Sequence, residues 1–248
     1  MGPSARDGTR GGSRRRHRLV LPKQQRERRT VADTTLTELA DRLSAWAERP
    51  GGTVIVGVAG APGAGKTTLV EALVRDLNGA VDDVETHRFA HVPMDGFHLS
   101  DRELTRQGLL TRKGAPETFD AYGYAALLER LRSPRSAVVY APGFERTLEQ
   151  PLAGDIPVFP AAKVILTEGN YLLLDRPEWR HVRSRCTEVW YCEPDDELRV
   201  QRLVERHVRF GKAPEQAAAW VRDVDEANSR LVQESRHRAD VVVRPVWV

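Results

Sequence analysis

The chain alternates between short, continuously hydrophobic runs and stretches in which hydrophobic residues recur every three or four positions. The continuous runs are rich in β-favouring residues and predict strands at 53–59, 89–94, 137–140, 163–167, 188–192 and 240–244. The stretches of helical period predict helices from Thr35 to the break at Pro50-Gly51-Gly52, and over 67–78, much of 99–132, 195–210 and 214–236. Because strands alternate with helices, we expect an α/β fold with a mainly parallel sheet between two helical layers.

Three stretches carry more specific expectations. The segment 141–160 is rich in proline and acidic residues and is assigned no helix or strand. In the helix at 195–210, a hydrophobic face lies beside a narrow arginine stripe that consists of Arg199, Arg202, Arg206 and Arg209. In the helix at 214–236, the spacing predicts a buried face made of Trp220, Val224, Ala227 and Leu231. Asp225 and Asn228 lie close to that face and are weak candidates for a site.

Composition narrows the class of protein. The chain has 248 residues, of which 40% are hydrophobic and 29% charged, which is typical of a folded globular protein. No hydrophobic run approaches the roughly eighteen residues needed to cross a bilayer, and the polar N-terminus lacks the pattern of a secretory signal. The two cysteines, Cys186 and Cys192, are too few for a disulfide framework and lack metal-ligand spacing. We therefore expect a cytoplasmic protein with no membrane partner.

Charge is distributed unevenly along the chain. Residues 1–30 carry ten Lys or Arg and two acids, a net charge of +8, which leaves −5 for the remainder of the +3 total. A basic segment with little to bury predicts a disordered tail, as a solvated extension or an upstream stretch, in preference to a contact with nucleic acid or anionic lipid. The mildly acidic remainder, 31–248, predicts one domain without a nucleic-acid partner.

The stretch GAPGAGKT, between the predicted strand at 53–59 and the helix at 67–78, fits G-x-x-x-x-G-K-[ST]. Glycines let the backbone wrap around an anion, and the following helix adds its positive N-terminal end. The residues expected to bind the nucleotide are Gly60, Ala61, Pro62, Gly63, Ala64, Gly65, Lys66, Thr67 and Thr68. Lys66, on a loop expected to be solvated, would reach the β- and γ-phosphates, and Thr67 would ligate Mg²⁺. A glycine-rich turn with a surface lysine is the plainer alternative.

A phosphate-binding loop indicates a nucleotide but not a reaction. A guanine-specific GTPase would carry Asn-Lys-x-Asp late in the chain, and this sequence contains no Asn-Lys pair. ATP-using enzymes are therefore favoured.

Two carboxylates follow predicted strands at the sheet edge where ligands bind. Asp95 lies just past the strand at 89–94, and it could accept the proton of an attacking hydroxyl or simply form an Asp-Gly turn. Glu168 follows the strand at 163–167 and could hold Mg²⁺, directly or through water, or be an ordinary turn residue. Phosphoryl transfer needs little more than such positioning and charge neutralisation.

With these motifs the chain resembles the P-loop kinase family of uridine kinase, phosphoribulokinase and bacterial type I pantothenate kinase. It is most similar to the small bacterial nucleoside/nucleotide kinase-like members. The matching stretches are GAPGAGKTT, MDGFH, RKGAPETFD, VYAPGFER, LTEGNYLLL and RADVVV, which together span about 53–244. The resemblance implies a P-loop NTPase fold with a helical lid at about 195–215. It also implies that Asp95 is the catalytic base, Glu168 the metal-linked acid and Asp120 an acceptor contact.

The acceptor pocket is expected between 97 and 146. Arg112, Lys113 and Asp120 bracket a Gly-Ala-Pro turn with aromatic residues nearby, which suits a small-metabolite site or ordinary helix–loop packing. His98 could bond the acceptor or be structural. By resemblance, Phe144 lies in the second acceptor-side segment.

The arginine stripe is either a solvated basic face or a lid over the triphosphate, and the resemblance favours Arg202 and Arg206 as lid residues. The sequence thus predicts an ATP- and Mg²⁺-dependent small-molecule kinase, in which Lys66, Asp95, Arg202 and Arg206 act in catalysis. A nucleoside or sugar acceptor is favoured, with pantothenate close behind. A P-loop regulator or chaperone without an acceptor is the alternative of another class. A homodimer is compatible with this interpretation.

Overall fold

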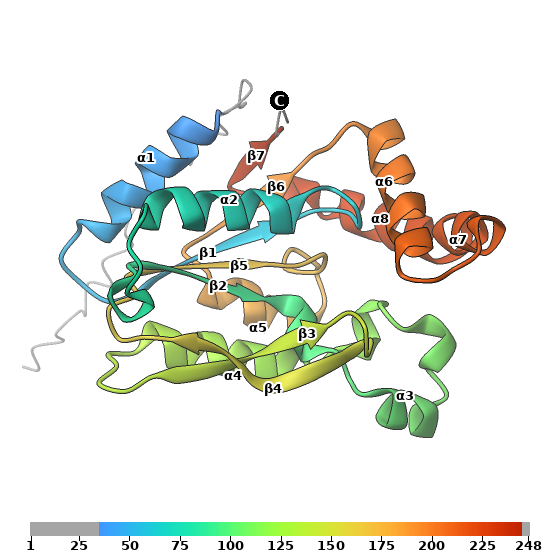
Figure 1. The fold of residues 1–248 in the computed structure, drawn as a ribbon, viewed down its shortest axis with the longest axis horizontal. Helices are drawn as coiled ribbons and strands as arrows, with labels where there is room; N and C mark the ends of the chain where they lie inside the picture. Colours follow the sequence, from blue (N-terminus) through green and yellow to red (C-terminus); the bar gives the residue numbers. More distant parts are fainter. Residues whose placement is uncertain (1–34, 245–248) are drawn as a thin grey trace, which may run out of the picture. The chain divides into compact units, whose positions relative to one another are not determined.

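The computed structural model describes residues 35–244, which are built around a five-stranded sheet (Figure 1). The sheet strands are β1 (Val54–Ala59), β2 (Phe89–Pro93), β5 (Val164–Glu168), β6 (Glu188–Cys192) and β7 (Val241–Val243). They lie in the order β2–β5–β1–β6–β7, and every neighbouring pair is parallel. The predicted α/β fold with a parallel sheet is confirmed.

Helices cover both faces of the sheet. On one face lie α1 (Leu36–Ala47) and α2 (Lys66–Asn78), and on the other α4 (Ala121–Arg132) and α5 (Pro177–Arg185) (Figure 1). Two hydrophobic clusters separate along the same lines, since Val56, Val58 and Leu166 pack with α1 and α2, whereas Ile55 and Ile165 pack with α4 and α5. Successive strand residues point to opposite faces, which explains this division. The predicted capping box at Thr35 and Glu38 is present at the start of α1.

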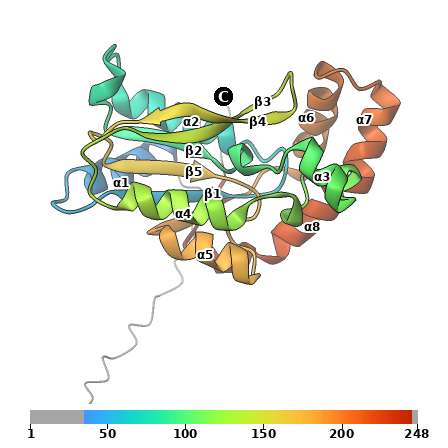
Figure 2. The same cartoon turned by 90° about the horizontal axis from the view of Figure 1, so that it is seen from below.

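The remaining helices gather at the carboxyl end of the strands. They are α3 (Asp101–Gln107), α6 (Asp196–Arg209), α7 (Pro214–Trp220) and α8 (Glu226–Glu234). Both ribbon views place them at the same end of the sheet (Figures 1 and 2). The described residues also form short helical turns along the chain. They are the 3₁₀ helices η1 (Val84–Thr86), η2 (Met94–Phe97), η3 (Leu110–Arg112), η4 (Pro116–Thr118) and η6 (Arg236–Arg238), and a π-helix η5 (Val221–Asp225).

The proline-rich segment 141–160 differs from expectation. It forms most of an antiparallel hairpin of β3 (Val139–Glu145) and β4 (Gln150–Val158), in a separate two-stranded sheet. Each strand of a two-stranded sheet has a free edge, so a proline without an N–H group costs little there. The strand predicted at 137–140 was therefore too short, because the prolines of 141–160 were interpreted as ending it.

The buried face predicted for 214–236 was wrong. The buried residues of this region are Ala217, Val221, Asp225, Ser229, Val232 and Ser235. The reason is the π-helix η5, which widens one turn and changes which positions face inward. The buried positions of this region include three polar residues, Asp225, Ser229 and Ser235. The helix α5 was also not predicted, although it begins at Pro177 and buries Trp179 and Val182.

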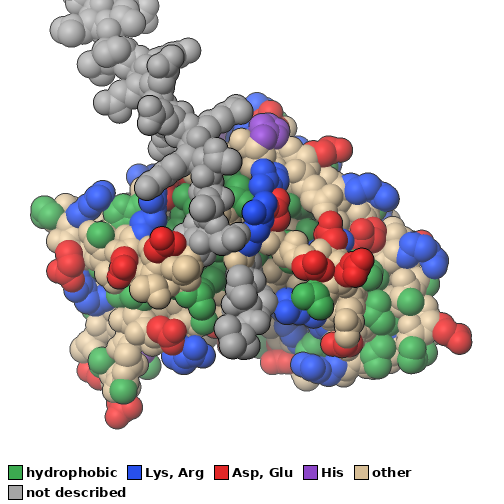
Figure 3. Space-filling view, turned by 90° about the horizontal axis from the view of Figure 1, so that it is seen from above, with side chains coloured by type: hydrophobic (Ala, Val, Ile, Leu, Met, Phe, Trp, Pro, Cys, Tyr) green, Lys and Arg blue, Asp and Glu red, His purple; other side chains and the backbone are tan. Residues whose placement is uncertain are grey.

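The predicted disordered tail, residues 1–30, lies outside the described residues, so that prediction stays untested. Within residues 35–244, no helix combines the length and the apolar character needed to cross a membrane. On the face seen in Figure 3, the described basic and acidic side chains are interspersed over the surface.

Gly96 provides a test of how tightly the hairpin packs against the end of β2. A Cβ atom at position 96 would collide with the carbonyl oxygen of Pro142 in β3. We expect Gly96→Ala to lower the free energy of unfolding by about 1–3 kcal/mol, because backbone cannot yield as a flexible side chain does. Urea denaturation would measure this. The control is Gly52→Ala, whose added methyl would lie 3.5 Å from the nearest atom, the Arg132 carbonyl oxygen. Equal stability of the two variants would contradict the prediction.

Candidate active site

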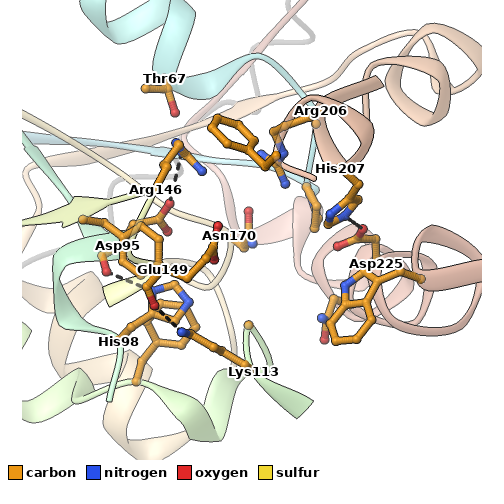
Figure 4. Close-up of a pocket in the computed structure, with 18 of the residues that line it drawn as sticks. Thr67, Asp95, His98, Lys113, Arg146, Glu149, Asn170, Arg206, His207 and Asp225 are labelled. Carbon is orange, nitrogen blue, oxygen red and sulfur yellow. Dashed lines mark hydrogen bonds and ion pairs between the residues drawn. The ribbon is translucent and has the colours of Figure 1, made fainter. Parts of the chain in front are cut away.

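A cavity of about 380 Å³ opens at the carboxyl end of the sheet. Several separate parts of the chain line it: the loop after β1, η2 after β2, the segment around Lys113, the β3–β4 hairpin, the loop after β5, and the region from Arg206 to Asn228. Figure 4 shows labelled side chains from all of these parts around one space. This is the sheet edge at which the sequence predicted a site.

The glycine-rich loop wraps the end of β1 and leads into α2, as predicted. Pro62, Gly63, Lys66 and Thr67 line the cavity. Gly63 has φ of +76°, and a Cβ there would lie 2.7 Å from Leu203 of α6, so the close contact requires glycine. The other residues of the predicted set, Gly60, Ala61, Ala64, Gly65 and Thr68, are not in the cavity lining.

Lys66 is buried, with 7% of its surface exposed, so the expectation of a solvated lysine was wrong. Its ammonium donates to the carbonyl oxygen of Ala61 at 3.0 Å and to Oδ1 of Asn170 at 2.7 Å. Burial lowers the pKa of Lys66, while the nearby carboxylate of Glu168 acts in the opposite direction. A buried cation is well suited to receive an anionic ligand, because the ligand's charge offsets the cost of burying the cation.

Glu168 is the last residue of β5 and is also buried. The hydroxyl of Thr67 donates to its Oε1 at 3.1 Å, and Nε2 of His91 lies 3.9 Å from the same oxygen. Burial and the Asp95 carboxylate raise the pKa of Glu168 to about 7, against the effect of Lys66. A hydroxyl beside a carboxylate, both oxygen donors, fits the preference of Mg²⁺. Thr67 and Glu168 are therefore the residues that could hold such an ion.

Asp95 lies in η2, and its side chain faces the cavity. One carboxylate oxygen lies 3.7 Å from the guanidinium of Arg146, which comes from the turn after β3. The backbone carbonyl of Asp95 accepts hydrogen bonds from the backbone N–H and from the ring Nδ1 of His98, at 3.2 and 2.9 Å. These contacts fix the turn that presents the carboxylate (Figure 4).

Three of the five predicted acceptor residues line the cavity: His98, Lys113 and Phe144. The His98 ring packs between Phe119 and Phe144, with ring centroids 4.0 and 4.8 Å away and the ring planes tilted by 42° and 44°. Burial lowers the pKa of His98, which keeps the ring neutral. Lys113 bonds Asp101 at 2.6 Å and also the backbone carbonyl of Glu149, so it ties α3 to the tip of the hairpin.

The other two predicted acceptor residues are placed elsewhere. Arg112 pairs with Glu117 at 2.6 Å on the surface. Asp120 caps α4, where its Oδ1 accepts a hydrogen bond from the backbone N–H of Gly123 at 2.8 Å. Neither residue is in the cavity lining. Asp is a preferred N-cap, so a capping role could have been read from the sequence.

The arginine stripe of α6 is divided between different environments. Arg206 lines the cavity, Arg202 is exposed and is not in the cavity lining, and Arg199 is buried with 2% exposed. The Arg199 guanidinium contacts Asp196 at 3.0 Å, Glu226 at 2.7 Å and Ser229 at 3.0 Å. Neither of the two interpretations of the stripe included such an anchor between α6 and α8.

Sequence reasoning missed several cavity residues. Asp101, Glu149, Asn170, His207 and Lys212 were not singled out, and Asp225 and Asn228 were rated weak. His207 Nε2 bonds the Asp225 carboxylate at 2.8 Å (Figure 4). Asn170 could have been found, because it follows Glu168 at the same strand end. The others come from α3, from the hairpin and from the region that runs from α6 to α8, where no strand end marks a site.

The anchoring role of Arg199 can be tested by stability. Arg199→Met keeps the bulk of the side chain but leaves Glu226 and Ser229 without their partner. We expect the free energy of unfolding to fall by about 1–3 kcal/mol, because hydrogen bonds to a buried charge are lost. Arg209→Met on the exposed surface is the matched control and should change it by less than about 0.5 kcal/mol. Similar thermal unfolding of both variants would show that Arg199 is not an anchor.

Comparison with known proteins identifies relatives by sequence. The chain is 37% identical over 163 residues to "ATP-dependent kinase-like protein notR′" of Aspergillus versicolor, covering 62% of this chain and 95% of that protein. It is 30% identical over 197 residues to "Putative uridine kinase C227.14" of Schizosaccharomyces pombe, covering 77% and 83%. No protein-family model matches the chain.

Solved structures of kinase-like proteins are also similar to this chain. A putative fructose transport system kinase from Silicibacter sp. TM1040 has a TM-score of 0.73 and 36% identity, covering 84% of this chain and 98% of that one. YFH7 of Saccharomyces cerevisiae, described as a putative P-loop containing kinase with a circular permutation, has a TM-score of 0.72 at 19% identity, covering 86% and 99%, and shows the shared fold. The chain belongs to the P-loop kinase family that includes these ATP-dependent kinase-like, uridine kinase-related and fructose kinase-related proteins.

Proposed function

We propose that this protein is a Mg²⁺-dependent kinase that transfers the γ-phosphoryl group of ATP to a hydroxyl of a small metabolite. The observation that carries the proposal is the set of side chains that line one cavity. Lys66 and the Thr67–Glu168 pair line it together with the Asp95 carboxylate and the aromatic residues around His98. A nucleotide site beside a carboxylate and a small-molecule subsite is what phosphoryl transfer to an alcohol needs.

On the nucleotide side, the backbone of residues 60–68 would cradle the phosphates, with the N-terminal end of α2 behind them. Lys66 would bind the β- and γ-phosphates. Thr67 and Glu168 would hold Mg²⁺, which when bound neutralises phosphate charge. Arg206, already in the cavity lining, would stabilise charge that develops on the transferred group. Arg202 is exposed in this structure, so a comparable role for it would require α6 to move.

On the acceptor side, Asp95 would accept the proton of the attacking hydroxyl, and Arg146 would orient the carboxylate. The rings of Phe119, His98 and Phe144 pack together and, with Lys113 beside them, form a subsite of mixed aromatic and polar character. Such a subsite suits a nucleoside or a sugar, since aromatic faces pack against rings and polar groups bind hydroxyls.

Relatives support the same range of acceptors, because one is named a putative uridine kinase and another a putative fructose transport system kinase. Pantothenate remains the alternative acceptor, from the resemblance of RKGAPETFD to pantothenate kinases. Arg112 and Asp120 have no part in direct acceptor binding in this proposal, because neither lines the cavity.

A nucleotide-binding regulator without an acceptor is the candidate of another class. It would hydrolyse ATP at the P-loop but would have no use for Asp95 and the aromatic residues around His98. The decisive experiment is a screen of nucleosides, simple sugars and pantothenate with ATP and Mg²⁺, following ADP release. An acceptor that raises ADP release well above background hydrolysis, with a phosphorylated product, supports the kinase. Background hydrolysis alone with all of them would favour the regulator.

Lys66→Ala tests the nucleotide side. We expect ATP affinity and turnover each to fall by about 100-fold or more, because the loop loses its only side-chain cation for the phosphates. The matched control is Lys163→Ala, which removes an exposed lysine far along the chain. Calorimetric titration with ATP and thermal unfolding should be recorded for both variants. Near-native turnover of a folded Lys66→Ala protein would rule out the P-loop role.

Asp95→Asn tests the base. General-base assistance is typically worth about 10²–10⁴-fold, so acceptor-dependent turnover should fall by that factor. ATP affinity should change little, since Asn preserves the shape and also suits the turn before Gly96. Asp82→Asn, at an exposed position, is the control. Unchanged turnover, or loss of ATP binding in step with turnover, would refute the role assigned to Asp95.

A further inference from the structure

Asn170 is a cavity residue with no role in the mechanism described above. It lies two residues beyond the end of β5, and its Oδ1 accepts a hydrogen bond from the Lys66 ammonium at 2.7 Å. In Figure 4 it lies between the side of the cavity that carries Asp95 and the side that carries Arg206 and His207. The amide is therefore in direct contact with the P-loop cation.

The residue after Asn170 anchors this loop. The Tyr171 side chain is completely buried, and its hydroxyl donates to the carbonyl oxygen of Gly114. The backbone that carries Asn170 is therefore held beside the P-loop, with the Asn170 amide oxygen bonded to Lys66.

The geometry of the ammonium explains what this contact achieves. A lysine ammonium has three N–H donors on a flexible stem. Ala61 and Asn170 accept two of them, which fixes the Nζ atom and gives the third N–H a defined direction. Asn170 is neutral, so it orients the cation without adding a second negative charge next to Glu168. An aspartate in its place would hold the ammonium by charge and repel phosphates.

We propose that Asn170 is the positioning residue of the P-loop lysine, which aims the Lys66 ammonium at the phosphates of the nucleotide. The inference rests on the proposed function, since it requires nucleotide binding at residues 60–68. Asn170 acts through Lys66, so its contribution to nucleotide binding exists only while the ammonium is present.

A double-mutant cycle tests this dependence. The wild type, Lys66→Ala, Asn170→Ala and the double variant are titrated with ATP in the presence of Mg²⁺. We expect Asn170→Ala alone to weaken ATP binding by about 10-fold, as for the loss of a hydrogen bond to a charged group. In the Lys66→Ala background the same change should weaken binding by less than about 2-fold, because coupled residues are not additive. A merely structural role would produce equal losses in both backgrounds.

The matched control is Asn78→Ala. Asn78 likewise uses its side chain in hydrogen bonds, to the backbone of Phe89 at 2.9 and 3.2 Å, but it lies at the far end of α2. Its replacement should lower the melting temperature and leave ATP affinity unchanged. If Asn170→Ala does not fold, Asn170→Leu serves as the second variant. It keeps the bulk of the side chain, removes the Oδ1 acceptor, and should weaken ATP binding by about 10-fold only when Lys66 is present.

A measurement without nucleotide completes the design. The chain has five lysines, so NMR of ¹⁵N-labelled lysine can resolve the Lys66 ammonium. We expect its protons to exchange with water at least several-fold faster in Asn170→Ala, with the other lysines unchanged. Normal ATP affinity and unchanged exchange in Asn170→Ala would overturn the inference while the proposed function stands. Failure of the wild type to bind ATP would overturn the proposed function and the inference together.

Discussion

The parallel register of β1, β5 and β2 is the constraint on which the site depends. Val58 of β1 and Pro93 of β2 both pair with Glu168 of β5, so the three strands end at the same level of the sheet. The glycine-rich loop follows β1, the turn with Asp95 follows β2, and the loop with Asn170 follows β5. Groups that lie far apart in the sequence therefore meet at one edge. A slip of one residue in either pairing would move a carboxylate to the opposite face.

The electrostatics of this edge follow from burial. Lys66 and Glu168 are both nearly inaccessible, and each is held by hydrogen bonds within the protein. Burial disfavours both charges, which lowers the pKa of the lysine and raises that of the carboxyl. Asp95 adds a further negative charge to Glu168, so the carboxylates repel each other. A ligand that brings a phosphate to Lys66 and a cation to Glu168 relieves both effects at once.

The features that the sequence predicted well are those determined by residues close together in the chain. The P-loop is contiguous, Glu168 and Asp95 follow hydrophobic runs, and the capping box of α1 spans four residues. The fold class followed from the alternation of strands and helices. The hairpin was missed because its prolines are tolerated only at free sheet edges, which is a property of the tertiary structure. The burial of Lys66 could not be read from a glycine-rich loop, because one of its two hydrogen-bond partners is Asn170, 104 residues away in the sequence.

The helix α6 shows why spacing alone cannot assign the roles of its arginines. Arg199 and Arg206 are seven residues apart, which is about two turns and places them on similar faces. The neighbours of that face change along the helix, from α8 at Arg199 to the cavity at Arg206. The His207–Asp225 bond ties the same helix to η5, so α6 is fixed to the following helices at both ends. Any closure over the nucleotide that moves α6 must therefore carry η5 and α8 with it, or break these buried contacts.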